Sequence, residues 1–161
     1  GDKSVQMDIL QRFMSHGVDP DRITLSGEIE DRVAHLLEYK KVDIALDTFP
    51  YPGVTTSVEA LWMEVPVLSL VGNSFLSSTA TGIAVNAGLI DWVADDIHEY
   101  VSKAVTFASN PSFLMMAKAK LNNVREDSAL FNIERFSRDF GEALIKMWEK
   151  HCGENHKTKL L

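Results

Sequence analysis

The sequence contains one cysteine, Cys152, and no apolar run long enough to cross a bilayer. A single cysteine cannot form an internal disulfide, and no residues at metal-ligand spacing surround it. Basic side chains are also scarce: 16 Lys and Arg stand against 23 Asp and Glu, which gives a net charge of −7. No basic cluster offsets this charge, so nucleic acid and anionic membranes are poor partners. We therefore expect a cytoplasmic protein without nucleic-acid or membrane partners.

Several motifs of enzyme chemistry are missing as well. The sequence has no glycine-rich dinucleotide fingerprint, no Walker loop, no paired Cys or His at metal spacing and no nucleophile elbow. These absences argue against a bound metal or cofactor and against covalent catalysis. Its 161 residues are 45% hydrophobic and 24% charged, which is typical of one folded domain or of part of a larger one. We expect this domain to span residues 1–152, followed by a flexible polar tail at 153–161.

Apolar spacing predicts short strands that alternate with helices. Strands are expected at 23–26, 42–47, 66–71 and around 92–93, and helices at 5–16, 30–39, 55–62, 77–86, 97–108, 110–125 and 133–150. Such alternation favours an α/β fold, with a parallel sheet of Rossmann-like type covered by helices on both faces. The apolar side of the C-terminal helices predicts that they pack back on the body.

Ligands of such sheets bind outside the carboxyl ends of the strands, so the loops after Leu25, Leu46 and Leu70 are candidates. The segment 53–57, Gly-Val-Thr-Thr-Ser, opens a helix after a proline-stiffened loop. Free N–H groups and the threonine hydroxyls would hold a phosphate or pyrophosphate there. Alternatively, Thr56 and Glu59 form a capping box that satisfies these donors without a ligand.

Four side chains have two interpretations each. Glu59 either caps its helix or accepts the hydroxyls of a ribose. Arg32 and His35 lie one turn apart, so they face either a common cleft or solvent. Asp47, at the end of a strand, either binds a ligand or braces the loop that follows.

The segments 18–23, 34–39, 42–51, 55–67 and 130–149 together resemble the C-terminal region of the protein O-linked N-acetylglucosamine transferases. These tetratricopeptide-containing enzymes are the glycosyltransferases of family 41, and the resemblance covers nearly the whole chain. It implies that the chain is the distal part of the second nucleotide-fold domain of a GT-B enzyme. That domain binds a uridine diphosphate (UDP) sugar, usually UDP-N-acetylglucosamine.

The resemblance also implies roles for individual residues. His35 would lie against the uracil, Arg32 near the ribose and diphosphate, and Glu59 on the ribose. Thr55 and Thr56 would hold the pyrophosphate. Such transferases use no metal or cofactor, and they need positive charge and hydrogen-bond donors to stabilise the leaving diphosphate.

The sequence departs from the family at two positions. Val54 stands where animal members have a histidine beside the diphosphate, and Ser78 stands where many bacterial members have an arginine. The family's diphosphate-binding lysine and its acceptor-binding domain would lie upstream, so acceptor proteins would bind outside this chain.

We therefore expect the donor-binding part of an inverting protein O-glycosyltransferase that is inactive as an isolated fragment. The alternatives are a non-catalytic nucleotide-binding or protein-interaction module, and a structural α/β domain in which Thr56 and Glu59 only cap. The absent upstream strands predict an exposed sheet edge and self-association through it.

Overall fold

The computed structural model describes residues 2–124 and 128–158. The chain divides into two units, Gly1–Glu38 and Tyr39–Leu161. The sequence predicts one domain over 1–152, and the structure places a boundary inside that range, between the second helix and the first strand.

The first unit contains two helices and a 3-10 turn. α1 (Lys3–Ser15) begins where the Asp2 carboxylate accepts a hydrogen bond from the N–H of Ser4 at 3.0 Å. It ends before Gly17, whose φ of +80° is the left-handed conformation that stops a helix. The turn η1 (Pro20–Arg22) and the helix α2 (Arg32–Glu38) follow.

The strand expected at 23–26 does not form. Residues 23–30 have no regular secondary structure. A strand needs a neighbour to bind its backbone N–H and C=O groups, and no strand lies elsewhere in the described part of this unit. An apolar pattern alone therefore does not form a strand here.

The second unit is built on a parallel sheet. The turn η2 (Tyr39–Lys41) leads into β1 (Ala45–Leu46), and β2 (Val67–Leu70) and β3 (Val93–Ala94) follow along the chain. The strand order is β1-β2-β3, with Ala45 opposite Val67 and Ser69 opposite Val93. β1 and β2 are shorter than the strands expected at 42–47 and 66–71, but the parallel arrangement confirms the predicted α/β class.

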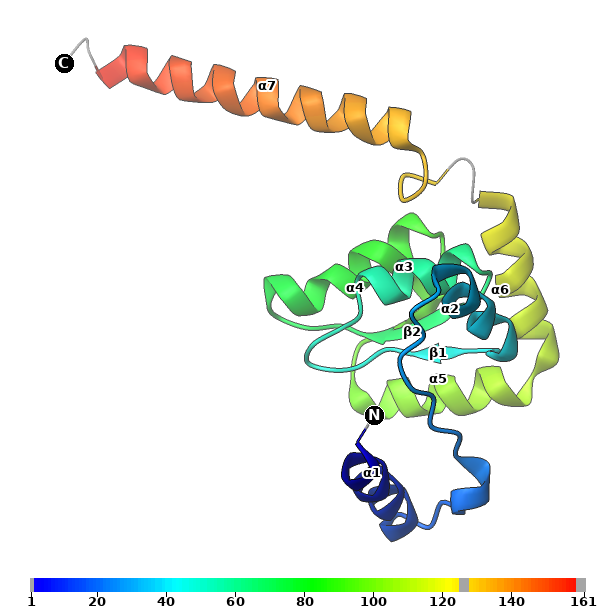
Figure 1. Cartoon of the computed structure of the whole chain (residues 1–161). Helices are drawn as coiled ribbons and strands as arrows, with labels where there is room; N and C mark the ends of the chain where they lie inside the picture. Colours follow the sequence, from blue (N-terminus) through cyan, green and yellow to red (C-terminus); the bar gives the residue numbers. More distant parts are fainter. Residues whose placement is uncertain (1, 125–127, 159–161) are drawn as a thin grey trace. The chain divides into compact units, whose positions relative to one another are not determined.

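Helices cover both faces of this sheet (Figure 1). α3 (Thr55–Trp62) and α4 (Phe75–Asn86) connect successive strands and lie on one face. The turn η3 (Ile90–Trp92) precedes β3, and α5 (Ile97–Ser109) lies on the other face, where α6 (Pro111–Val124) packs against it. The expected return of the C-terminal helices to the body therefore holds for α5 and α6.

The core of this unit lies between β2 and the helices around it. Leu68, at the centre of β2, is fully buried. The other large buried side chains come from α3, α4, η3, α5 and α6: Leu61, Ile83, Trp92, Phe107 and Leu121. This core fixes the carboxyl ends of β1 and β2, and therefore the loops that start there.

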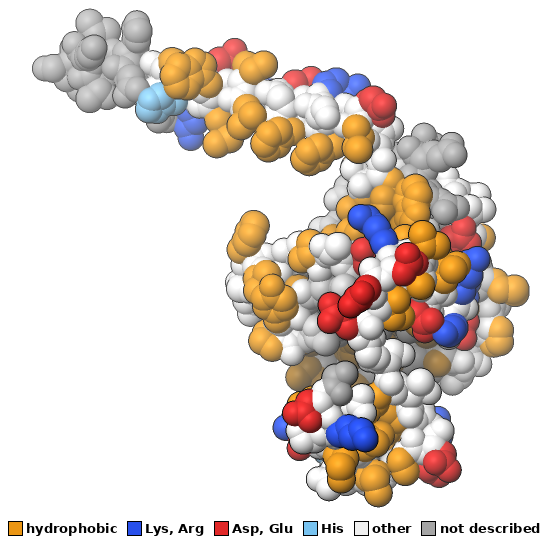
Figure 2. All heavy atoms as spheres, viewed as in Figure 1, with side chains coloured by type: hydrophobic (Ala, Val, Ile, Leu, Met, Phe, Trp, Pro, Cys, Tyr) orange, Lys and Arg blue, Asp and Glu red, His pale blue; other side chains and the backbone are white. Residues whose placement is uncertain are grey.

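The last helix, α7 (Ile133–Thr158), differs from the prediction in two respects. It continues into the segment expected to be a flexible tail, whose residues 159–161 lie outside the described residues. Its apolar side chains are exposed rather than packed back, and they line one side of the helix (Figure 2): Phe136, Phe140, Leu144, Met147 and Trp148. An amphipathic pattern predicts that one face of a helix is buried, but it does not identify the surface against which that face packs. None of the described helices meets the length and hydropathy needed to span a membrane.

Candidate functional site

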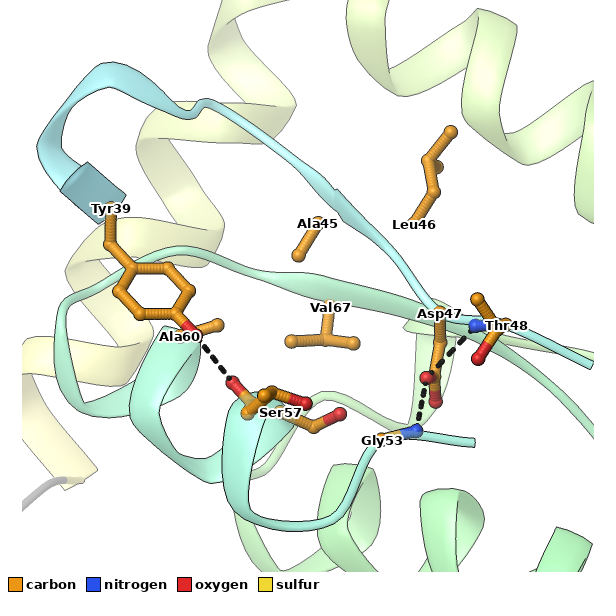
Figure 3. A pocket seen from close by; sticks show the side chains of 10 residues that line it. Tyr39, Ala45, Leu46, Asp47, Thr48, Gly53, Ser57, Ala60 and Val67 are labelled. Carbon is orange, nitrogen blue, oxygen red and sulfur yellow. Dashed lines mark hydrogen bonds between the residues drawn. The ribbon is translucent and has the colours of Figure 1, made fainter. Parts of the chain in front are cut away.

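The candidate site lies at the carboxyl end of β1. There the chain leaves the sheet at Asp47 and returns as α3 at Thr55. Between them lies a pocket of about 220 Å³, shown in Figure 3. Its walls come from η2, β1, the loop after it, α3 and β2: Tyr39, Ala45, Leu46, Asp47, Thr48, Gly53, Thr56, Ser57, Ala60 and Val67.

The N-terminus of α3 has no side-chain cap. Its N-cap residue is Val54, with φ −115° and ψ −73°, and an aliphatic side chain offers no acceptor. The first hydrogen bond of the helix runs from the N–H of Val58 to the carbonyl of Val54 at 3.0 Å. The preceding N–H groups of the first turn, at 55–57, therefore have no acceptor within their own helix.

The capping-box interpretation of Thr56 and Glu59 is therefore wrong. That box requires Thr56 to be the N-cap, whereas the helix begins one residue before it. Thr56 thus lies inside the first turn and Glu59 in the second, too far along the helix to reach its first N–H groups. The loop decides this, because it brings the chain into helical geometry already at Val54.

Thr55 and Thr56 are both exposed, whereas Ser57 is buried beneath them. Two hydroxyls and the uncapped N–H groups therefore meet solvent at one helix end. Such an end carries partial positive charge and offers several donors, which are the features that bind a phosphate group. The N-terminus of α3 therefore has the hydrogen-bond donors that phosphate binding by Thr55 and Thr56 requires.

The N-terminus of the next helix, α4, is capped by side chains of its own, unlike that of α3. Ser74 caps α4 through a reciprocal arrangement with Ser77. The hydroxyl of Ser78 donates to the carbonyls of Ser74 at 2.7 Å and Gly72 at 3.2 Å. Ser78 therefore stabilises its own turn. The family resemblance implies an arginine at this position in many bacterial members.

Glu59 lies half-buried on α3, close to the phenol of Tyr39. Burial raises the pKa of the Tyr39 hydroxyl above its ordinary value, and the charge of Glu59 raises it further. The same hydroxyl donates to the carbonyl of Thr56 at 3.2 Å. Tyr39 thus stabilises the first turn of α3 through this hydrogen bond, a role that no local sequence pattern indicates.

Asp47 braces the loop, which was one of its two expected roles. Its Oδ1 atom accepts from the N–H of Gly53 at 2.7 Å and from that of Thr48 at 3.0 Å. Its Oδ2 atom accepts from the hydroxyl of Ser69 at 3.0 Å. The backbone carbonyl of Asp47 accepts from the Tyr100 hydroxyl at 2.9 Å.

The other two predicted residues lie in the first unit. Arg32 is exposed and His35 is half-buried, both on α2, and their spacing of three residues puts them on one side of that helix. Thr55, Thr56 and Glu59 belong to the second unit. That all five residues bind one ligand stays a prediction. Within the described ranges, no three His, Cys, Asp or Glu residues are grouped so as to hold a metal ion.

Comparisons with known proteins all lead to one family. The family model of glycosyl transferase family 41 matches residues 3–140. The chain is 31% identical over 149 residues to a protein of Oryza sativa subsp. japonica named probable UDP-N-acetylglucosamine–peptide N-acetylglucosaminyltransferase SPINDLY. It is 30% identical over 138 residues to the UDP-N-acetylglucosamine–peptide N-acetylglucosaminyltransferase of Caenorhabditis elegans.

These alignments cover 92% and 86% of this chain but only 16% and 12% of the two relatives. The chain thus spans less than a fifth of the length of either. Among solved structures, a mutant of the O-GlcNAc transferase of Thermobaculum terrenum matches with a TM-score of 0.87 and 28% identity. That match covers 94% of this chain and 29% of the other. The family and the α/β fold agree with the resemblance seen in the sequence.

Proposed function

Because the chain belongs to glycosyltransferase family 41, we propose that it forms the donor-binding part of an enzyme that transfers a sugar from UDP to a protein hydroxyl. The donor is UDP-N-acetylglucosamine, in keeping with the names of the relatives. The observation that carries the proposal is the uncapped N-terminus of α3, where Thr55 and Thr56 face solvent at the carboxyl end of β1.

Each residue has a specific role in this proposal. Thr55 and Thr56 bind the diphosphate with their hydroxyls and with the N–H groups of the first turn. Glu59 accepts hydrogen bonds from the ribose hydroxyls. For His35 and Arg32, which lie on α2 of the first unit, the proposal rests on the family resemblance alone, which assigns His35 to the uracil and Arg32 to the ribose and diphosphate.

The reaction needs stabilisation of the departing diphosphate. As the bond between the sugar and the diphosphate breaks, negative charge grows on the leaving oxygen, and donors fixed in place stabilise that charge better than mobile water does. The helix end and Arg32 supply part of this stabilisation without a metal ion. The acceptor hydroxyl attacks from the opposite face of the sugar, with inversion, and the residues that bind the acceptor lie outside this chain. The isolated chain therefore binds the donor but does not turn it over.

Calorimetric titration of UDP into the protein tests this proposal. Thr55→Ala and His35→Ala should each weaken binding at least tenfold, because one removes a phosphate donor and the other a base contact. Thr106→Ala, an exposed threonine on α5, is the matched control and should bind like the wild type. Absence of UDP binding by the wild type, or equal binding by all variants, would contradict the proposal.

A second function has its own support, namely a nucleotide-binding module without turnover. Val54 places an aliphatic side chain at the N-cap of α3, and the Ser78 hydroxyl is used by the backbone of its own turn. The side chains of Val54 and Ser78 therefore contribute no phosphate-binding group, although the resemblance predicts such groups at both positions in relatives. Binding of UDP together with no sugar transfer by the longer protein that contains this chain would favour this module over the enzyme.

A further inference from the structure

The carboxylate of Asp47 joins three segments that meet at the candidate site. Its Oδ1 atom accepts from the N–H of the next residue, Thr48, and from the N–H of Gly53, which directly precedes Val54. Through Oδ2 it binds Ser69 on β2. Figure 3 shows the two backbone contacts beside the pocket. These bonds close the loop 47–53 into a ring and tie that ring to the neighbouring strand.

The position of Gly53 is in turn coupled to the first turn of α3. A Cβ atom at Gly53 would lie 2.6 Å from the hydroxyl oxygens of both Thr56 and Ser57, closer than such atoms approach. The backbone of Gly53 is therefore packed directly under the side chains that begin the helix. A side chain at position 53 would therefore have to displace the hydroxyls of Thr56 and Ser57.

We propose that Asp47 is a positioning residue for the diphosphate site, which it shapes without touching the ligand. It holds Gly53 so that the hydroxyls and N–H groups of Thr55 and Thr56 converge on one point. This inference rests on the proposed function, because it presumes that a diphosphate binds at that helix end.

The negative charge of Asp47 allows a positioning effect on diphosphate affinity to be distinguished from a direct electrostatic effect. A carboxylate near a diphosphate repels it, so through charge alone the removal of Asp47 would strengthen binding. Through positioning, its removal releases Gly53 and weakens binding. Two substitutions distinguish these effects. Asp47→Ala removes both the charge and the hydrogen bonds. Asp47→Asn removes the charge but keeps the contacts with Gly53 and Thr48, because the amide oxygen still accepts from both N–H groups. Its contact with Ser69 changes direction, with the amide nitrogen as the donor.

The test compares the affinities of UDP and uridine for the wild type and both variants. We expect Asp47→Ala to weaken UDP about tenfold and to leave uridine unchanged, because only the diphosphate contacts the first turn of α3. Asp47→Asn should bind UDP at least as tightly as the wild type. The ratio of the two affinities separates a loss of binding at the diphosphate from a loss that both ligands share.

Gly53→Ala provides a second route to the same result if Asp47→Ala fails to fold. It leaves the carboxylate in place but displaces the first turn from below, so it should also lower UDP affinity without affecting uridine. Asp91→Ala is the control, since it removes an exposed carboxylate from η3, at the amino end of β3 and away from the site.

The outcomes separate the two levels of the argument. A wild type that binds UDP no better than uridine overturns the proposed function, and the inference with it. A wild type that prefers UDP, together with Asp47→Ala or Gly53→Ala variants that keep this preference, overturns the inference alone. Equal loss of both ligands in Gly53→Ala also overturns it.

Discussion

A negative charge at position 54 should separate the stability of α3 from its ability to bind a diphosphate. Val54 is the N-cap residue and its side chain is 44% exposed, so an aspartate fits there without displacing the core. Its ψ of −73° is helical, whereas a residue that caps through its side chain is usually extended. An aspartate in this conformation therefore stabilises the helix mainly through its charge near the positive helix end, by about 0.5 kcal/mol.

The same charge opposes a bound diphosphate. Two unit charges about 6 Å apart, at an effective dielectric constant of about 20 to 40, repel by roughly 1.5 to 3 kcal/mol. Val54→Asp should therefore weaken UDP between about tenfold and a hundredfold, while urea denaturation shows an unchanged or slightly higher free energy of unfolding. Val54→Asn has the same shape without the charge, and its affinity should stay within about threefold of the wild type.

Calorimetric titration of UDP into the three proteins, at two salt concentrations, measures this effect. The loss in Val54→Asp should shrink as salt rises, because the charges are exposed and screened. Unchanged UDP affinity in Val54→Asp would refute the placement of the diphosphate at this helix end. An equal loss in Val54→Asn would show that shape rather than charge governs position 54.

Three further predictions concern stability and assembly. Leu68→Ala should lower the free energy of unfolding by about 2 to 5 kcal/mol in urea denaturation, because Leu68 is fully buried, whereas the exposed Leu76→Ala should cost less than about 1 kcal/mol. The pKa of Glu99 lies below its ordinary value of 4.5, first because the Asp95 N–H donates to its carboxylate and then through Lys103. A lowered carboxyl pKa contributes stability above pH 4.5 that is lost as the pH falls through the folded-state value. The wild type should therefore lose more stability than Glu99→Gln on acidification below pH 4.5, and parallel curves would contradict this. In the described part of the second unit, β1 pairs with β2 alone, so light scattering should show a mass that grows with concentration; a constant monomer mass would count against pairing through that edge.

Local patterns in the sequence predicted most helices of this chain closely. The Asp96 side chain caps α5, and Pro111 is the first residue of α6, a position that proline favours. These features act within one turn, so neighbouring residues suffice to specify them. The threonines at 55 and 56 were also recognised as the start of a helix after a strand, and the structure places them there.

Predictions failed where a segment depends on distant partners. The apolar pattern at 23–26 is that of a strand, but without a neighbouring strand in its unit it stays irregular. The capping box at Thr56 matched a common motif, yet the N-cap of the helix is Val54, two residues earlier, after the loop held by Asp47. The apolar stripe of α7 indicated a buried face, and those side chains are exposed.

The sequence by itself determined the α/β class, the alternation of strands and helices in the second unit and the family, because these depend on periodicity and on motifs carried by neighbouring residues. Only the tertiary structure decided how the helix end is built. Tyr39 reaches Thr56 across 17 residues, Ser69 reaches Asp47 across 22, and Tyr100 reaches the same residue across 53. Hydrogen bonds over such separations form only after the sheet and its helices have packed, so no local pattern records them.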